Sequence, residues 1–171
     1  LPLAILIVYS FNDGKSTTWS GFSLRWYRQL FFGSGDLWRS FENSVLIALG
    51  SSALSTTIGT LGAIGLTWYS FVHKKYLKVA SYLPIIIPEI VIGISLLIFF
   101  AGIHWNLSIW TIFVAHTTFN IPFVLFIIMS RLDEFDYSVI EAAYDLGASE
   151  LYTLRRVILP MTIPGIVSAF L

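Results

Sequence analysis

Apolar runs separated by polar segments dominate the sequence. Long runs cover residues 44–71, 79–102 and 109–130, and shorter ones cover residues 1–9 and 161–171. A helix that crosses a bilayer needs about 20 mostly apolar residues. We therefore expect three complete membrane-spanning helices and two partial ones. The first run is interpreted as the end of a helix and not as a signal peptide, and the two partial runs indicate a piece of a longer protein.

Composition supports a membrane protein. The 171 residues are 56% hydrophobic and 12% charged, with a mean hydropathy of +0.78. The formal net charge is zero, with 10 basic and 10 acidic residues, so no nucleic-acid partner is expected. The sequence has no cysteine, which excludes disulfides and thiolate metal sites. We predict an all-α membrane protein, with residues 1–171 forming a single transmembrane domain.

A polar and aromatic loop is expected over residues 10–43, with a turn at residues 12–14 (Asn-Asp-Gly). Phe22, Trp26 and Leu30 follow at i, i+4 and i+8, and arginines fall on the opposite side. This spacing predicts a short amphipathic helix. Two locations remain open for it, the membrane interface and the surface of the helix bundle.

Small residues recur along the run at 44–71. Ser55, Gly59 and Ala63 stand four residues apart. Small side chains allow the backbones of two membrane helices to approach closely. This face is therefore predicted to pack against another helix, with a role in lining a pathway as the alternative.

The distribution of lysine predicts the orientation. Residues 72–78 contain three lysines, whereas the short connection at residues 103–108 has no lysine or arginine. Basic residues concentrate in short cytoplasmic loops. We therefore expect residues 72–78 and 131–160 on the cytoplasmic side and residues 10–43 on the outer side, although this outer loop also carries basic residues.

The most informative single residue is Glu89. It follows Pro88, and Pro84 stands one turn earlier. It lies about eleven residues into a segment of about 24, which predicts a carboxylate near the middle of the membrane. Such a residue usually faces the protein interior or a wet cavity, and prolines loosen the backbone beside it. Glu89 is expected either to line a substrate path or to pair with another helix.

His116 and Asn120 are weaker candidates for the same path. They stand four residues apart in the run at 109–130 and share one helix face. The alternative is that they hold helices together by hydrogen bonds. The sequence has no HExxH, GxSxG or Walker lysine motif, so no catalytic residue, metal ligand or cofactor is predicted.

The segment at 131–160 is a polar island between two apolar runs. Ser138 and Glu141 have the spacing of a capping box, so a helix is expected over about 139–146. Gly147 follows, where a residue that tolerates positive φ commonly ends a helix.

A second short helix should follow in this island. Ser149 can cap it, and we expect it to run to about Val157, before Pro160. The island holds six acidic and three basic residues, a net charge of −3. A capped helical pair of this kind is expected to dock on a soluble partner with a basic rim.

One motif in the island carries a family resemblance. Glu141-Ala142-Ala143, followed at the family's spacing by Gly147, Val157 and Leu159-Pro160, resembles the EAA loop of ABC-importer permeases. That family prefers isoleucine where Val157 stands. The resemblance implies the type I ABC importer transmembrane fold, with residues 139–158 fitting a groove on an ABC ATPase subunit. The residues it assigns to this coupling are Glu141, Ala142, Ala143, Asp145, Gly147, Leu159 and Pro160.

The resemblance extends over nearly the whole chain. The texts LIVYSFN…GFSLRWY, PIIIPEIVIGISLLIFF and FNIPFVLFIIMSRL are similar to the second permease subunit of spermidine/putrescine importers. This implies a multi-pass protein of the bacterial inner membrane that imports polyamines, with Glu89 offsetting the desolvation of an ammonium group.

The partners implied by the resemblance are a second permease subunit, ATPase subunits that bind the ATP, an extracytoplasmic solute-binding protein and the lipid bilayer. Related importers carry ferric iron, thiamine or aminoethylphosphonate, so these substrates remain alternatives. A membrane scaffold or receptor that docks a soluble protein through the same loop is a further alternative.

Overall fold

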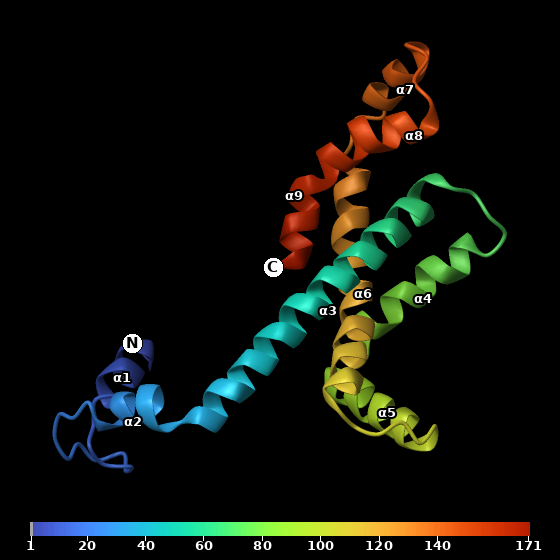
Figure 1. The fold of residues 1–171 in the computed structure, drawn as a ribbon. Coiled ribbons are helices and arrows are strands. Elements are labelled where there is room, and N and C mark those ends of the chain that lie inside the picture. Colours follow the sequence, from blue (N-terminus) through green and yellow to red (C-terminus); the bar gives the residue numbers. More distant parts are fainter. Residues whose placement is uncertain (1) are drawn as a thin grey trace. The chain divides into compact units, whose positions relative to one another are not determined.

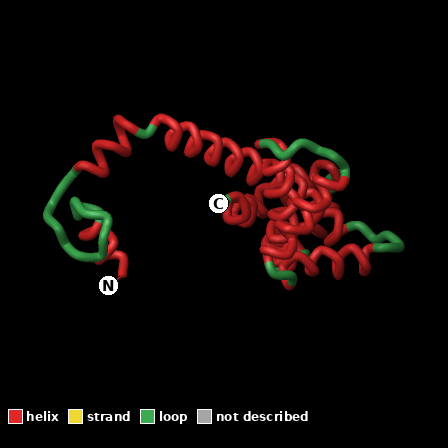
Figure 2. Tube along the Cα trace, turned by 90° about the horizontal axis from the view of Figure 1, so that it is seen from below, coloured by secondary structure: helices red, strands yellow, loops and turns green. Residues whose placement is uncertain are grey.

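A computed structural model describes residues 2–171, and it is helical nearly throughout (Figures 1 and 2). The elements are α1 (Pro2–Tyr9), α2 (Arg25–Gly33), α3 (Gly35–Trp68), α4 (Lys74–Ile86), α5 (Glu89–Gly102), α6 (Ile109–Asp133), α7 (Ser138–Asp145), α8 (Glu150–Thr153), the π-helical turn η1 (Leu154–Ile158) and α9 (Leu159–Phe170). The predicted all-α class is confirmed. One compact unit ends at Val45 and a second comprises Leu46–Leu171, with α3 beginning in the first and continuing through the second.

The first unit is organised by the buried side chain of Asn12. Its amide Nδ2 donates to the carbonyl of Thr18 at 2.9 Å, and its Oδ1 accepts from the backbone N–H of Ser20 at 2.8 Å. These bonds fold the loop back, so that Phe22 forms an isolated β-bridge with Asn12. The expectation that Phe22 belongs to the amphipathic helix is therefore wrong. Helix α2 begins only at Arg25, because Phe22 and Ser23 are paired with the loop, with the Ser23 N–H donating to the Phe11 carbonyl at 2.7 Å.

Trp26 connects α2 to this loop. Its indole Nε1 donates to the Asn12 carbonyl at 3.0 Å, and the side chains of Lys15 and Arg25 both lie over its ring. No residue of α2 is buried. A short helix with Trp26 and Leu30 is thus confirmed, while its location at the membrane interface stays a prediction.

The second unit depends on a close contact between α3 and α6. Ser55, Gly59 and Ala63 are buried on α3. A Cβ atom added to Gly59 would stand 2.5 Å from Cγ1 of Val124, so only glycine fits at this crossing. The predicted packing role of the small residues is confirmed.

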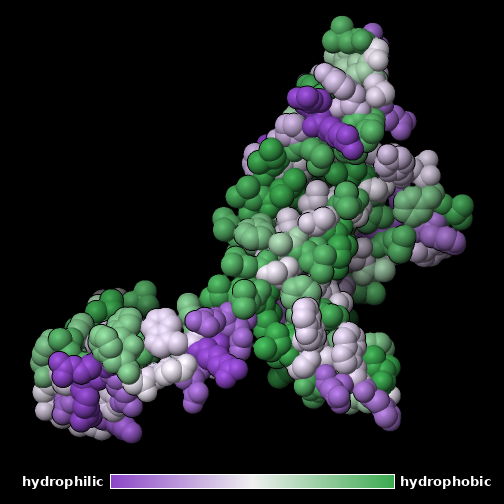
Figure 3. Space-filling view, in the orientation of Figure 1, coloured by the Kyte–Doolittle hydropathy of each residue, from purple (hydrophilic) through white to green (hydrophobic). Residues whose placement is uncertain are grey.

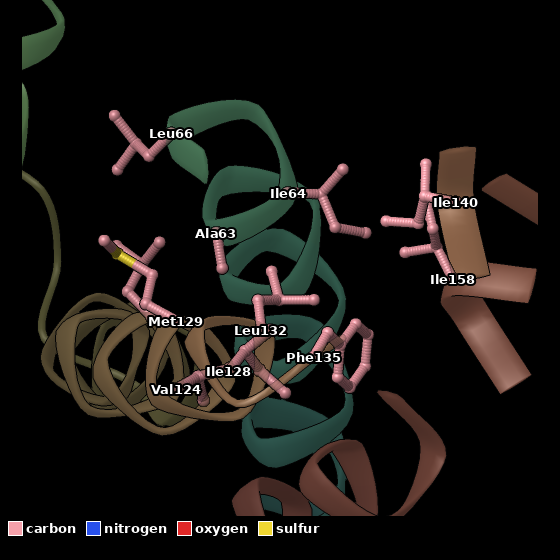
Figure 4. Packing of buried hydrophobic residues seen from close by; sticks show 11 residues of the cluster. Ala63, Ile64, Leu66, Val124, Ile128, Met129, Leu132, Phe135, Ile140 and Ile158 are labelled. Atoms are coloured by element: carbon pink, nitrogen blue, oxygen red, sulfur yellow. The ribbon is translucent and has the colours of Figure 1, made fainter. Parts of the chain in front are cut away.

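Toward their C-terminal ends, α3 and α6 share a hydrophobic core with the segment that follows α6 (Figure 4). Ile128 and Leu132 are fully buried at its centre. Helix α9 lies alongside α6 (Figure 1). Gly165 of α9 allows the aliphatic part of Arg131 to pass close by, since a Cβ atom added to this glycine would stand 3.1 Å from Cγ of Arg131.

The run at 79–102 forms two helices that meet at a sharp bend. Helices α4 and α5 meet at a bend of 107°, and the break falls at Ile87 and Pro88. Pro84 stays inside α4. Pro88 ends the regular helix because it lacks a backbone N–H and disfavours α geometry in the residue before it. Glu89 is the first residue of α5, directly after this break, and its depth in the membrane stays a prediction.

The second unit exposes a large apolar surface (Figure 3). By length and composition, α3 and α6 are long enough to cross a membrane, and the bent α4–α5 pair is a third candidate. Helices α1 and α9 have 8 and 12 residues, fewer than the roughly 20 that a complete span needs. Apolar side chains such as Ile90 and Ile98 of α5 and Phe126 of α6 are exposed, as expected for surfaces that face lipid.

The α3–α6 crossing can be tested with a matched pair of glycine substitutions. Gly59→Ala should destabilise the protein by about 1–3 kcal/mol, because the new methyl group overlaps Val124. Gly65→Ala, on the same helix with no atom within 4 Å of its built Cβ, should be neutral or stabilising by up to about 1 kcal/mol. The measurement is thermal unfolding of the purified protein in detergent. Equal melting temperatures for the two variants would contradict the close packing.

Candidate functional site

A cavity of about 250 Å³ lies between α5 and α6. Its lining residues are Glu89, Ile92, Gly93, Leu96, Ala115, His116 and Phe119. The α5 members follow Glu89 at i+3, i+4 and i+7, so one face of the helix supplies them all. The bend before Pro88 places the Glu89 carboxylate at the N-terminus of α5, where the helix dipole favours negative charge.

The structure brings two of the three predicted path residues together. Glu89 and His116 line the same cavity, whereas Asn120 does not. Among residues 2–171, the Glu89 side chain has no hydrogen-bond or ion-pair partner. Sequence reasoning missed Phe119, which the i, i+3 spacing from His116 could have indicated.

The chemistry of this cavity suits a cation. Its walls are mostly apolar, with one carboxylate, one imidazole and the aromatic ring of Phe119. The Glu89 side chain is exposed in this chain, and its carboxylate attracts a cation, as does the face of an aromatic ring. The arrangement can therefore bind an ammonium group.

The second candidate site comprises α7, α8 and η1, and is called the coupling unit after the role that the family resemblance predicts for it. Helix α7 begins at Ser138, and Asp136 Oδ1 accepts a hydrogen bond from the Ser138 backbone N–H at 3.0 Å. Hydrogen bonds from Ser138 lower the pKa of the exposed Asp136 carboxyl group. The predicted capping box of Ser138 and Glu141 is wrong, because Ser138 is already inside the helix and Asp136 takes the capping role.

The turn between α7 and α8 follows the prediction. Gly147 has φ +82°, a conformation that favours glycine, and its N–H donates to the Tyr144 carbonyl at 2.8 Å. Ser149 caps α8, since its Oγ accepts from the Tyr152 N–H at 3.3 Å. Both expectations are confirmed.

Pro160 does not end the second helix as expected. The chain continues from α8 through η1 into α9, and Pro160 stands in the first turn of α9. In η1 the N–H of Leu159 reaches the carbonyl of Leu154, five residues back. This wider π-helical turn absorbs the irregularity, and a proline in a first helical turn has no intrahelical N–H bond to lose.

Two isoleucines anchor the coupling unit to the spanning helices. Ile140 of α7 and Ile158 of η1 are buried against Ile64 of α3 (Figure 4). The sequence alone did not single out either residue, because Val139 and Val157 beside them are also apolar and only the fold decides which neighbour is buried. Leu159 packs partly against the same core.

The remaining residues assigned to coupling face outward. Glu141, Ala142, Asp145, Gly147 and Pro160 are exposed, and Ala143 is half-buried. Beside them lies a surface hollow of about 640 Å³. The residues that line this hollow are Ala143, Leu146, Gly147, Ala148, Ser149, Tyr152 and Val157. Leu146 is 89% exposed at this edge, an apolar side chain without a partner in the described part of the chain.

The anchoring role of Ile140 can be tested against its neighbour. Ile140→Ala removes a buried side chain and should cost about 2–5 kcal/mol of local stability. Val139→Ala changes a side chain that is 42% exposed on the same helix and should cost less than about 1 kcal/mol. Hydrogen exchange of the α7 amides measures both effects. Equal exchange in the two variants would show that α7 does not depend on this core.

Comparison with known proteins identifies the family. Residues 55–171 match the family described as binding-protein-dependent transport system inner membrane component. The spermidine/putrescine transport system permease protein PotC of Haemophilus influenzae is 40% identical over 172 residues, which cover 100% of this chain and 66% of the relative.

Two proteins of Escherichia coli K12 are also similar. Its PotC protein of the same description is 37% identical over 99% of this chain and 64% of the relative, and its putrescine transport system permease protein PotI is 34% identical over 99% and 63%. The chain thus spans a little under two thirds of the length of these relatives. Because the family match covers residues 55–68 of α3 and everything after it, more than half of the chain, the chain belongs to the inner membrane components of binding-protein-dependent transport systems.

Proposed function

We propose that this chain forms part of the membrane-spanning permease subunit of an ATP-driven importer for polyamines. The observation that carries the proposal is the Glu89 carboxylate, which has no partner among residues 2–171, in the cavity with Phe119 between helices whose other faces are apolar. The names of the relatives, which refer to spermidine and putrescine, support the same substrate class.

The cavity favours polyamines over a phosphonate, one of the substrates that the family resemblance left open. A polyamine alternates ammonium groups with short alkyl segments. In the cavity, the Glu89 carboxylate and the Phe119 ring can contact an ammonium group, and Ile92 and Leu96 can contact an alkyl segment. A phosphonate group would meet the Glu89 charge unfavourably, since like charges repel strongly in apolar surroundings.

The coupling unit supplies the connection to ATP hydrolysis. Its exposed acidic face and the hollow beside Leu146 would dock on a cytoplasmic ATPase subunit, through residues 139–158. Ile140 and Ile158 would transmit the movement of that subunit to α3 and α6, because buried packing resists compression. ATP is bound and hydrolysed by the partner, and this chain performs transport and no catalysis.

The complete importer would contain further subunits. A second permease subunit would complete the translocation path, and an extracytoplasmic solute-binding protein would deliver the substrate on the side of residues 10–43. Movement of the coupling unit would then switch the Glu89 cavity between outward and inward access.

The substrate role of Glu89 is tested by Glu89→Gln. This change keeps the size of the side chain but removes the charge, so putrescine uptake should fall about tenfold to a hundredfold, since a hydrogen bond to a charged group contributes about 1.5–3 kcal/mol. Glu42→Gln, an exposed acid of the first unit, is the control and should keep uptake. The measurement is uptake of radiolabelled putrescine by vesicles that contain the assembled importer. A scaffold or receptor places no demand on this charge, so unchanged uptake would refute the proposed substrate site.

The coupling role of the turn is tested at Gly147. Valine is strongly disfavoured at φ +82°, whereas asparagine tolerates this region. Since no atom lies within 4 Å of a built Cβ, both substitutions act through the backbone alone. Gly147→Val should reduce the putrescine imported per ATP hydrolysed by about tenfold, and Gly147→Asn by less than about twofold. Full coupling in Gly147→Val would argue against a rigid lever.

A further inference from the structure

A second cavity lies where the C-terminal end of α3 meets the coupling unit, away from the Glu89 cavity. Its volume is about 230 Å³. The lining residues are Ile64, Trp68, Tyr69, Tyr137, Ile140, Tyr144, Glu150, Leu154 and Ile158. The proposed transport function does not use this cavity. Its lining includes four aromatic rings and one carboxylate besides aliphatic side chains.

Four aromatic rings contribute to its walls. Trp68 and Tyr69 come from the end of α3, Tyr137 precedes α7, and Tyr144 belongs to α7. Within residues 2–171, none of these four rings stacks on another ring or lies under a lysine or arginine. Aromatic residues elsewhere in the chain do form such pairs, for example Phe11 with Phe22. Tyr69, Tyr137 and Tyr144 are exposed and can offer a ring face to a ligand, whereas Trp68 is half-buried and packs against the hydrophobic core.

Glu150 adds one negative charge to these rings. It stands in the first turn of α8 and forms no ion pair within the described residues. The apolar floor of the cavity is made by Ile64, Ile140 and Ile158 (Figure 4). Aromatic faces with a single carboxylate recognise an organic ammonium ion, whereas a hydrated metal ion needs several oxygen ligands and an anion would be repelled.

We propose that this cavity binds an organic ammonium ion and that the bound ion ties α3 to the coupling unit. The walls come from both α3 and the α7–η1 segment, so an ion held between them favours the arrangement in which they are joined. The volume fits one small ammonium ion and is below the range typical of drug-sized ligands. This inference goes beyond the proposed transport function, because the site is separate from Glu89 and binds without transport.

Direct binding to the intact importer in lipid nanodiscs tests the site. The probe is radiolabelled tetramethylammonium, measured by equilibrium dialysis in the absence of ATP. Saturable binding is expected for the wild type, and both Glu150→Gln and Tyr137→Leu should weaken it by about tenfold. Glu150 and Tyr137 are exposed, so these variants are expected to fold.

Matched controls come from the same polar segments. Asp133→Asn removes an exposed acid of the 131–160 island, and Tyr76→Leu removes an exposed ring at the start of α4. Neither residue lines the cavity, so both variants should bind the probe as the wild type does.

The Glu89→Gln variant distinguishes binding at the second cavity from binding at the Glu89 cavity. This variant should keep the Glu150-dependent binding even where putrescine uptake is lost, so failure of one proposal is distinguishable from failure of the other. Absence of saturable binding in the wild type would overturn the inference. Wild-type affinity in both Glu150→Gln and Tyr137→Leu would do the same, as would binding that disappears only with Glu89→Gln.

Discussion

The close approach of α3 to α6 at Gly59 is the contact on which the second unit depends. In a bilayer the surrounding lipid is as apolar as the side chains, so helices associate through dense packing and not through removal of apolar surface from water. Gly59 permits Val124 to enter the space that a side chain would occupy. The core that continues from this crossing reaches Ile140, so the same packing that joins two spanning helices also holds the coupling unit.

Helix α6 connects the Glu89 cavity to the core beneath the coupling unit. His116 and Phe119, in its first half, line the Glu89 cavity, while Ile128 and Leu132 near its other end form the core beneath the coupling unit. Helix α6 continues from Ile109 to Asp133 although Pro122 removes one of its backbone hydrogen bonds, so the helix can still transmit displacement along its axis. In the proposed importer, a movement of α7 against this core would therefore displace α6 and, with it, the wall of the substrate cavity.

Much of the local structure follows from local sequence. The apolar runs predicted the helices, the spacing of Ser55, Gly59 and Ala63 predicted a packing face, and Gly147 and Ser149 ended and began helices as their chemistry requires. The errors arose where a distant or competing group intervened. Asn12 holds Phe22 in an extended segment, Asp136 replaces Ser138 as the cap, and a π-helical turn carries the chain past Pro160.

The sequence by itself determined the all-α class, the membrane character and the family motif, because hydrophobicity and helix-ending residues act over a few turns of chain. Only the tertiary structure decided that α4 and α5 bend by 107°, that Glu89 and His116 share a cavity without Asn120, and that Ile64, Ile140 and Ile158 meet. These features depend on which helix faces touch. That choice is made by the fit between surfaces far apart in the chain, which no short stretch of residues specifies.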